Sequence, residues 1–303
     1  MTVRWLEIGH VRVAALLDGE ADLSDPIVEA FPDMPPEGVF ASRSAMPRIY
    51  GADDHWHLFI RAWLVVHPEG VALVDTGVGG AGAPAASWFA HPGRLHDALR
   101  DANSSPDQID TVVITHVHDD HLGGAVARDP GRAPAFANAR YVIQRADLEW
   151  LRRRSGDAGG AGEGDTPDDE AEEARVITDA LVRPLENAGS IEAIDGHRRL
   201  TDAIELRHAP GHTPGHQIVR IVSRNRRLLI AGDTFNHPAQ IAHPDWPAGT
   251  DDAPPSAARA RRSMLADVLS HPGTIVAPSH FDEPFGVIAS GAGGLAEWRP
   301  TPT

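Results

Sequence analysis

The sequence contains no cysteine among its 303 residues. Disulfide bridges, thiolate metal ligands and a cysteine nucleophile are therefore excluded, and any metal ion has to be held by His, Asp or Glu side chains. Basic residues are also scarce, because 27 Lys and Arg stand against 43 Asp and Glu, which gives a net charge of −16. Nucleic-acid backbones are bound mainly by clustered Lys and Arg, so this balance argues against nucleic acid as a partner.

Long apolar runs are missing as well. No stretch approaches the roughly 18 apolar residues of a membrane-spanning helix, and the first residues, MTVRWLE, show no basic segment followed by an apolar run of the signal-peptide type. These absences predict a soluble, cytoplasmic protein that does not bind a membrane. Hydrophobic residues make up 42% of the chain, which is enough for a sizeable core.

Short apolar runs rich in β-branched residues alternate with helical patterns along the chain. The expected strands are 11–17, 58–66, 71–74, 111–115, 141–143, 191–194, 204–208, 218–222, 228–231 and 274–278. The expected helices are 92–102, 146–154, 170–187 and 255–269. This alternation is typical of an α/β protein. Since no linker separates the two halves, we expect a single domain over residues 1–303.

Two segments depart from this alternation. Residues 25–57 place large apolar side chains, Phe40 and Trp56 among them, between prolines and glycines. The segment is too irregular for a core strand and too apolar for a linker, so we expect it to cover the functional site; a packed N-terminal extension or a dimer contact is the alternative. Residues 155–169 (SGDAGGAGEGDTPDD) are acidic and rich in Gly, which predicts a mobile loop.

The most informative segment follows the expected strand 111–115 and reads HVHDDHLGG, with three His and two Asp within six positions. His116 and His118 point the same way on an extended backbone, and the following turn brings Asp120 and His121 beside them. Neutral imidazole and carboxylate are suitable ligands for zinc. A polar surface cluster is the alternative, but so many imidazoles in one turn have no packing purpose. The cluster therefore predicts a metal site.

Further ligands are expected at other strand ends. His212 lies in a Pro- and Gly-rich turn after the strand 204–208, Asp233 follows the strand 228–231, and His280 follows the strand 274–278. Taken singly, each of these residues is better explained by a capping or turn role. Their shared position at the ends of strands instead favours a common site.

The order of these residues resembles the pattern of the metallo-β-lactamase superfamily, over about residues 71–285. That pattern is a strand ending in Asp-Thr-Gly, then His-x-His-x-Asp-His, a Gly-His turn, Gly-Asp and a final His. The matching residues are Asp75, His116, His118, Asp120, His121, His212, Asp233 and His280. The resemblance implies an α/β fold, a four-layer αβ/βα sandwich of two mixed β-sheets flanked by helices.

The resemblance also implies two divalent metal ions. One ion is held by His116, His118 and His212. The other is held by Asp120, His121 and His280, and Asp233 bridges the two. Zinc is the expected metal, although His and Asp ligands also admit manganese, iron, cobalt and nickel.

Neighbouring residues receive supporting roles. We expect Asp75 to be a buried carboxylate that orients a ligand, with a plain turn residue as the alternative. His208 and His216 flank the ligand turn and are expected to be hydrogen-bonded structural histidines, with His216 supporting the ligands. Asp119 is expected to be solvated and not to bind metal.

Two such ions about 3.5–4 Å apart can share a bridging water and lower its pKa towards about 7, so that hydroxide forms at neutral pH. The hydroxide attacks a carbonyl carbon or a phosphorus atom. Asp120 is the expected catalytic residue, because it can hold the nucleophile and pass a proton to the leaving group. The predicted activity is hydrolysis.

The substrate class follows partly from residues 208–217 (HAPGHTPGHQ), which are similar to the corresponding turn of acyl-homoserine lactonases and related organophosphate hydrolases. The lactonases carry Tyr three residues after the bridging Asp, whereas this chain has Asn236 there. We expect a hydrolase of small-molecule esters or lactones. The alternatives are a phosphotriesterase or β-lactamase-like hydrolase, and a non-catalytic metal-binding module of the same fold.

The expected substrate pocket combines two segments. Asn236 and Phe235 come from the loop 235–246, and Trp56 and Phe40 come from residues 25–57. The only partner that these features predict is a small-molecule substrate. A homodimer is compatible with the sequence.

Overall fold

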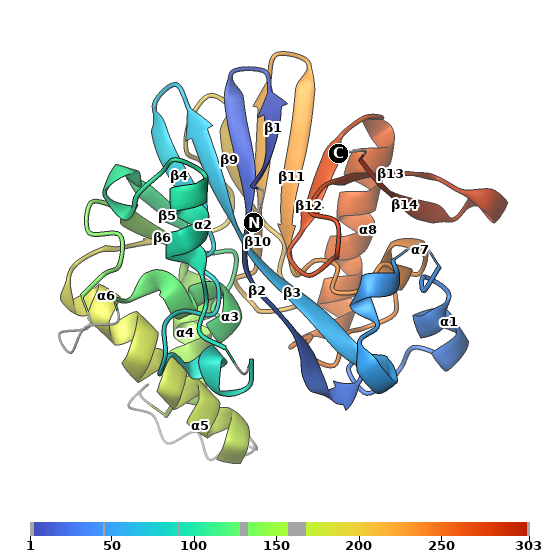
Figure 1. The fold of residues 1–303 in the computed structure, drawn as a ribbon, viewed down its shortest axis with the longest axis horizontal. Helices are drawn as coiled ribbons and strands as arrows, with labels where there is room; N and C mark the ends of the chain where they lie inside the picture. The colour runs from blue at the N-terminus through green and yellow to red at the C-terminus, as the bar shows by residue number, and fades with distance from the viewer. Residues whose placement is uncertain (1–2, 45, 90, 128–132, 157–167, 302–303) are drawn as a thin grey trace. The chain divides into compact units, whose positions relative to one another are not determined.

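The structure is a computed structural model (Figure 1), which describes residues 3–44, 46–89, 91–127, 133–156 and 168–301. The chain forms two compact units, each assembled from several segments. The first unit contains residues 1–5, 13–19 and 61–196, and the second contains residues 6–12, 20–60 and 197–303. A single domain over 1–303 stays a prediction.

The first sheet has seven strands in the order β1-β2-β3-β4-β5-β6-β7. Their bounds are β1 (Arg4–Ile8), β2 (Val11–Pro26), β3 (His55–His67), β4 (Gly70–Val74), β5 (Thr111–Val113), β6 (Arg140–Gln144) and β7 (Ile191–Ile194). Strands β3 and β4 pair antiparallel, whereas β4, β5, β6 and β7 pair in parallel. The carboxyl ends of β4 and β5 therefore lie at one edge, where the Asp-Thr-Gly and His-x-His segments begin.

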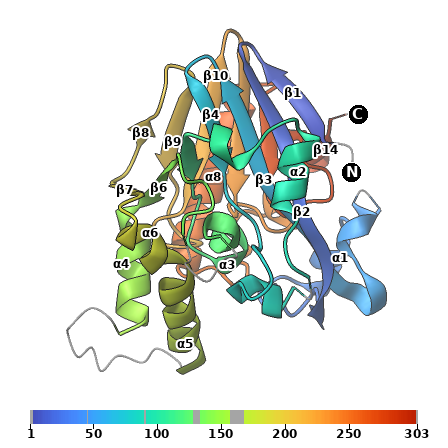
Figure 2. The same cartoon turned by 60° about the vertical axis from the view of Figure 1, so that its left-hand side comes forward.

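Helices of the first unit complete its core. They are α2 (Leu95–Asp101), α3 (Asp119–Leu122), α4 (Arg145–Arg154), α5 (Asp168–Ile177) and α6 (Arg183–Asn187). Figure 2 shows α4, α5 and α6 beside β6 and β7. Buried side chains of the strands, such as Leu73 and Tyr141, share one apolar cluster with Leu99, Leu148 and Leu185 of the helices. Parallel strands need such crossover helices, which cover the sheet.

The second sheet belongs mainly to the second unit, in the order β14-β13-β12-β11-β10-β9-β8. Its strands are β8 (Arg198–Arg199), β9 (Ile204–His208), β10 (Gln217–Ser223), β11 (Arg226–Gly232), β12 (Ile275–Pro278), β13 (Gly286–Ser290) and β14 (Ala296–Pro300). Strands β11 and β12 pair in parallel, and the other pairs are antiparallel. The prediction of two mixed β-sheets with helices is confirmed.

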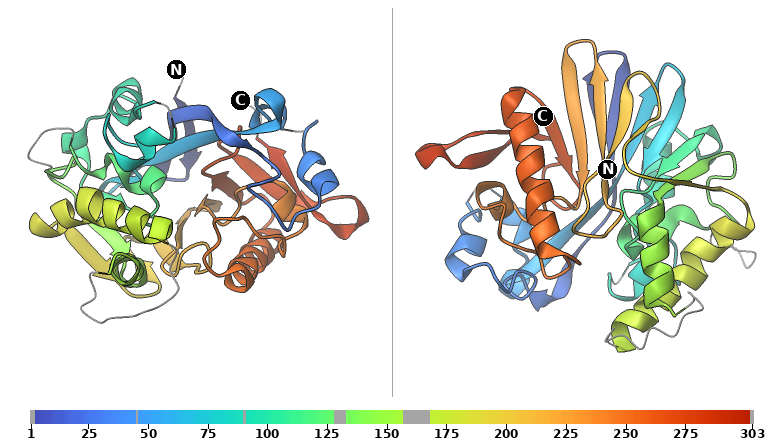
Figure 3. Two further views of the ribbon diagram at one scale, coloured as in Figure 1. Left: turned by 90° about the horizontal axis from the view of Figure 1, so that it is seen from below. Right: turned by 180° about the vertical axis from the view of Figure 1, so that it is seen from behind.

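The long helix α8 (Pro254–Ser270) lies along the second sheet (Figure 3). Its buried residues recur at helical spacing and include Ala257, Met264, Leu265 and Val268, which gives the helix an apolar face. Arg261 interrupts this face and is nevertheless buried. The unit also contains two short helices, α1 (Pro36–Phe40) and α7 (Ala239–Ala242).

Residues 25–57 pack within the second unit. Phe31 is fully buried, and its ring centroid lies 5.1 Å from those of both Trp56 and His237. The expectation of an irregular segment throughout was wrong at its two ends, because β2 continues to Pro26 and β3 begins at His55. A role in covering the functional site stays a prediction.

The expected helix 170–187 is interrupted. A π-helical turn, Thr178–Val182, joins α5 to α6. Pro184 explains the change, because it has no N–H to donate to the carbonyl of Ala180 and its ring pushes that carbonyl away.

Most of the expected mobile loop 155–169 lies outside the described residues, which leave out 157–167. Of the described ends, Ser155 caps α4 and Asp168 begins α5. In the part of the chain that the structure describes, the helices are all too short or too polar to cross a membrane.

Candidate functional site

The first set of candidate ligands follows β5 in the first unit. His118 is the N-cap residue of α3 and keeps an extended backbone, while Asp120 and His121 lie on the helix itself. The Nε2 atom of His116 lies 3.0 Å from Nδ1 of His118, and Nε2 of His121 lies 3.4 Å from Oδ2 of Asp120. Two ligands of a tetrahedral ion with bonds of about 2.0–2.1 Å are about 3.4 Å apart, so both pairs suit a shared cation.

Asp75 holds His121 from behind. Its Oδ2 atom accepts a hydrogen bond from Nδ1 of His121 at 2.9 Å, and Thr115 donates to both carboxylate oxygens, from its N–H at 2.7 Å and its hydroxyl at 2.8 Å. The backbone N–H and the hydroxyl of Thr76 also donate to the carbonyl of His121. With Nδ1 bonded to Asp75, His121 presents Nε2 as its ligand atom.

Asp119 differs from its expected state. The side chain is buried, with 6% of the residue exposed, and it accepts a hydrogen bond of 2.9 Å from the indole N–H of Trp88. Burial and the neighbouring charge of Asp120 raise the pKa of Asp119 to about 7, against the opposing effect of Trp88. The expectation of a solvated carboxylate was wrong, because the sequence did not indicate that Trp88 would cover it.

The second set of candidate ligands lies at strand ends of the second unit. His212 lies in the turn between β9 and β10, Asp233 follows β11, and His280 follows β12. All three are nearly fully buried. The Oδ2 atom of Asp233 lies 2.9 Å from Nε2 of His280 and 3.5 Å from Nε2 of His212. One carboxylate oxygen therefore faces two imidazole nitrogens, an arrangement suited to a bridging ligand.

Asp251 and Arg261 support His212, and the sequence analysis missed both. Nδ1 of His212 lies 3.3 Å from Oδ1 of Asp251, and both terminal nitrogens of the Arg261 guanidinium donate to Oδ2, at 3.1 and 3.2 Å. Burial alone would raise the pKa of Asp251, but the His212 hydrogen bond, the Arg261 charge and the N–H of Ala248 together lower it. An arginine on the apolar face of a helix was the signal that could have found this pair.

Hydrogen bonds of two histidine rings hold the second set of candidate ligands in place. Nδ1 of His280 donates to the carbonyl of Phe59 at 2.8 Å, which leaves Nε2 directed at Asp233. His216 accepts a hydrogen bond from the N–H of Asp233 at 3.0 Å, and its Nδ1 donates to the carbonyl of Ala209. His216 therefore joins the turn that carries His212 to the strand end that carries Asp233.

The expected pocket residues take different positions. The amide of Asn236 donates to Oδ2 of Asp233 at 2.8 Å, and the Trp56 ring meets the His280 ring edge-on at 6.3 Å. Phe235 is fully buried. Phe40 packs against Tyr50, with ring centroids 5.9 Å apart.

Tyr50 is held by two contacts of its hydroxyl group. Its hydroxyl donates to the carbonyl of Val39 at 2.5 Å and lies 3.3 Å from Nε2 of His237. Burial lowers the pKa of His237 to about 3, so its imidazole is neutral at pH 7, and Nδ1 accepts the N–H of Ala239. The Nε2–H of His237 then donates to Tyr50. Burial also raises the pKa of Tyr50 above its usual value, so the hydroxyl stays protonated.

Seven of the described residues belong to groups of side chains able to hold a metal ion: His116, His118, Asp120, His121, His212, Asp233 and His280. They are the residues that the sequence motifs single out. Their donor atoms, imidazole nitrogens and carboxylate oxygens, suit divalent zinc and other first-row metals.

Comparisons with known proteins agree with this pattern. An N-acyl homoserine lactonase of Bacillus cereus is 22% identical over 187 residues, which are 57% of this chain and 62% of the relative. A lactonase of a Bacillus species is 24% identical over 172 residues, 52% of this chain and 56% of the relative. The chain thus matches less than two thirds of the length of these relatives.

Two solved structures share the fold over nearly the whole chain. The dizinc quorum-quenching lactonase AidC, solved with a product, has a TM-score of 0.82 and 23% identity, covering 99% of this chain and 98% of that one. The hydrolase AbOPH of the β-lactamase superfamily has a TM-score of 0.82 and 21% identity, covering 100% and 98%. The family model described as the metallo-beta-lactamase superfamily matches residues 56–280. The chain belongs to the metallo-β-lactamase superfamily.

Proposed function

We propose that this protein is a metal-dependent hydrolase that cleaves a small-molecule ester or lactone. The observation that carries the proposal is the chemistry of the seven candidate ligands, which are all His or Asp and lie at strand ends or directly after them. Donor atoms lie close together within each set, at 3.0 Å between His116 and His118 and 2.9 Å between Asp233 and His280, so a small widening of these pairs gives the ligand spacing of a divalent cation.

The ligand assignment follows the superfamily pattern. His116, His118 and His212 would hold one divalent ion, and Asp120, His121 and His280 would hold the other. Asp233 would be the ligand shared by both, and its Oδ2 atom, which faces both His212 and His280 within the second unit, supports this role. We propose zinc as the metal; AidC, described as a dizinc lactonase, is consistent with this choice.

The bound ions supply a water of lowered pKa and positive charge where the carbonyl oxygen gains charge. Asp120 orients the attacking water and accepts its proton, and the same carboxyl then protonates the leaving oxygen. Asp75 keeps the imidazole of His121 in the tautomer that presents Nε2. Asp251 does the same for His212.

The proposed substrate is a neutral lactone or ester with an apolar group. Relatives named N-acyl homoserine lactonases support a lactone. In this chain Asn236 stands at the position of the lactonase tyrosine, and its amide is already bonded to Asp233. We therefore propose that Asn236 positions the bridging carboxylate, while Trp56, beside His280, offers an apolar surface for the acyl group.

The test combines metal analysis with a substrate panel. Protein purified without chelator is analysed for metal, and hydrolysis of lactones, aryl esters, phosphotriesters and a β-lactam is measured for wild type and Asp120→Ala. Asp97→Ala, an exposed position on α2, is the matched control. We expect about two metal ions per chain, turnover of a lactone or ester, and loss of that turnover only in Asp120→Ala.

Other outcomes separate the alternatives. Preference for a phosphotriester or a β-lactam would change the substrate class and keep the hydrolase. Metal without turnover of any substrate would favour a non-catalytic metal-binding module. Absence of metal would refute the ligand assignment itself.

A further inference from the structure

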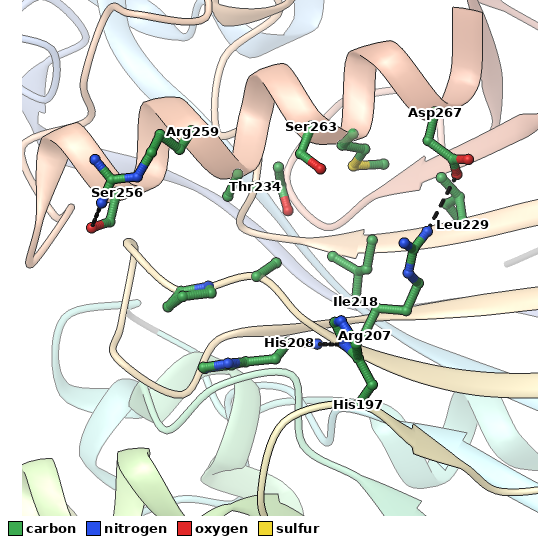
Figure 4. Close-up of a pocket in the computed structure, with 14 residues that line it drawn as sticks. His197, Arg207, His208, Ile218, Leu229, Thr234, Ser256, Arg259, Ser263 and Asp267 are labelled. Atoms are coloured by element: carbon green, nitrogen blue, oxygen red, sulfur yellow. Dashed lines mark hydrogen bonds and ion pairs between the residues drawn. The ribbon is translucent and has the colours of Figure 1, made fainter. Parts of the chain in front are cut away.

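A cavity of about 300 Å³ lies in the second unit between α8 and strands β9, β10 and β11 (Figure 4). Its volume is at the lower end of the range of about 300–1,000 Å³ that small-molecule sites occupy. None of the seven candidate metal ligands lines it. The proposed hydrolysis therefore leaves this cavity without a function.

The floor of the cavity follows from strand register. Arg207 on β9 lies directly opposite Ile218 on β10, so their side chains share one face of the sheet. Leu229 on β11 is opposite Arg220, two residues from Ile218, and therefore lies on the same face. The floor is thus apolar, with a guanidinium at its edge.

The facing wall is one side of α8. Ser256, Arg259, Ala260, Ser263 and Met264 line the cavity, and each has another member of the set three or four residues away, which places them on one side of the helix. Ala260 and Met264 add apolar surface opposite the floor. Ser256 and Ser263 add hydroxyl groups to this wall, and Arg259 donates a hydrogen bond to the Ser256 hydroxyl at 2.7 Å.

Positive charge dominates the lining. The lining contains two guanidinium groups, Arg207 and Arg259, and one carboxylate, Asp267, which already receives two hydrogen bonds from Arg227, at 2.9 and 3.1 Å. The contact between Arg207 and Asp267 is 3.6 Å long and therefore too long for a hydrogen bond. The donors of Arg207 are available to a ligand, in a chain whose net charge is −16.

A further donor comes from His197. Its Nδ1 atom accepts the N–H of His208 at 3.0 Å, so the neutral ring carries its proton on Nε2 (Figure 4). Hydrogen-bond donors and positive charge thus surround an apolar floor.

We propose that this cavity binds a small organic carboxylate with an aliphatic chain. A guanidinium pairs with a carboxylate through two parallel hydrogen bonds, which makes Arg207 the anchor. The aliphatic chain lies on Ile218, Leu229 and Met264, where it removes apolar surface from water.

The position of the cavity gives such a ligand contact with two functional segments. Ala209 lines it and belongs to the turn that carries His212, and Thr234 lines it beside Asp233. The N–H of Ala209 donates to the carbonyl of His216 at 2.7 Å, which closes that turn. A bound carboxylate therefore touches the outer side of both segments.

The test is calorimetric titration of the metal-loaded protein with hexanoate. Acetate, which lacks the chain, and hexan-1-ol, which lacks the charge, are the comparison ligands. We expect hexanoate to bind and both comparison ligands to bind at least about tenfold more weakly. Hexan-1-ol loses the charged hydrogen bonds, each worth about 1.5–3 kcal/mol, and acetate loses the burial of the chain, worth about 0.8 kcal/mol per CH₂ group; either loss is a tenfold change or more.

Variants separate this cavity from other carboxylate sites, including a bound metal. Arg207→Gln removes the anchor, and Ala260→Leu fills the cavity with a residue of high helix propensity. Each should weaken hexanoate binding about tenfold or more, whereas Arg262→Gln, an exposed position on α8 outside the cavity, should leave it unchanged. Thermal unfolding checks that each variant is folded.

Two results would overturn the proposal. One is hexanoate binding that is equal in wild type, Arg207→Gln and Ala260→Leu, which would place the ligand elsewhere. The other is the absence of hexanoate binding to the folded wild-type protein.

Discussion

Each unit contains a buried carboxylate behind a candidate ligand histidine. In the first unit, Oδ2 of Asp75 lies 2.9 Å from Nδ1 of His121. In the second, Oδ1 of Asp251 lies 3.3 Å from Nδ1 of His212. Both side chains are fully buried. The two carboxylates do the same work, which is to fix the orientation and tautomer of an imidazole.

Their charge environments are different. Besides His121, Asp75 accepts hydrogen bonds from the N–H and the hydroxyl of Thr115, which are both neutral donors. Asp251 is bonded to the buried guanidinium of Arg261. Orientation of the imidazole therefore requires an acceptor at Nδ1 but no particular charge balance. The negative charge of Asp75 therefore favours a cation bound by His121. In the second unit, the positive charge of Arg261 balances the charge of Asp251.

The largest expected effect comes from breaking the charged pair. Arg261→Met leaves Asp251 buried without its cation, and loss of one partner of a buried pair costs about 3–5 kcal/mol. We expect the free energy of unfolding, measured by urea denaturation, to fall by that amount. Arg262→Met, the neighbouring exposed position, is the control and should change it little.

The double variant Asp251→Asn/Arg261→Met sharpens this result. It removes both charges and should recover part of the stability lost in Arg261→Met. If the double variant is as unstable as the sum of the single variants, packing of the arginine side chain, rather than its charge, explains the loss.

Asp75→Asn should have a smaller effect on stability. No buried cation is left behind, and asparagine tolerates the left-handed backbone at this position, where φ is 58°. The NH₂ group of the new asparagine cannot accept the hydrogen bonds that His121 and Thr115 donate to the carboxylate. We therefore expect the free energy of unfolding to fall by about 1–3 kcal/mol.

Zinc binding by Asp75→Asn shows whether Asp75 supports the metal centre or has only a structural role. Zinc affinity, measured by competition with a chromophoric chelator, should fall about 10–100-fold. Asp110→Asn, an exposed position at the start of β5, is the control and should bind zinc as the wild type does. Unchanged zinc affinity in Asp75→Asn would remove Asp75 from the metal centre.

Much of the fold could be predicted from local patterns. Strands β4, β7 and β9 were predicted with their observed ends or nearly so, because apolar runs bounded by Gly, Pro or Asp mark them. Strands β1, β8, β13 and β14 were missed. Strand β8 has two exposed residues, and β14 has one buried side chain, Trp298, so neither of these two shows an apolar run.

The candidate ligands could be predicted because each lies in a short motif directly after a strand. Asp251 and Arg261 could not, because they are ten residues apart, lie in no motif and meet only when the loop before α8 is folded. The burial of Asp119 was missed for the same reason, since its partner Trp88 is 31 residues away in the sequence. Tertiary contacts of this kind leave no local pattern.

Thr115→Val tests the neutral hydrogen-bond donors of Asp75 and should have a still smaller effect on stability. It removes the hydroxyl donor to Asp75 and keeps the backbone N–H and the shape of the side chain. We expect the free energy of unfolding to fall by about 1 kcal/mol. The control is Thr111→Val on the same segment, which removes a hydroxyl that donates to Asp110 in a half-exposed contact. This variant should lower the free energy of unfolding by less. An equal or larger loss in the control would show that the hydroxyl of Thr115 contributes little to holding Asp75.

Acid sensitivity is the smallest expected difference, and it comes from Asp251. Although burial opposes it, the His212 hydrogen bond and the charge of Arg261 lower the pKa of this carboxyl below its ordinary value of 3.8. The unfolded chain therefore takes up the proton first as the pH falls. The stabilisation is fully present above about pH 4 and is lost as the pH falls through the folded pKa.

Urea denaturation at pH 6 and pH 3 tests this expectation. Between these two pH values the free energy of unfolding should fall more for wild type than for Asp251→Asn/Arg261→Met, while the exposed control Asp202→Asn should behave as wild type does. Parallel losses in all three proteins would mean that Asp251 is no more acidic in the folded protein than in the unfolded chain, and that its pairing with Arg261 does not favour the charged form.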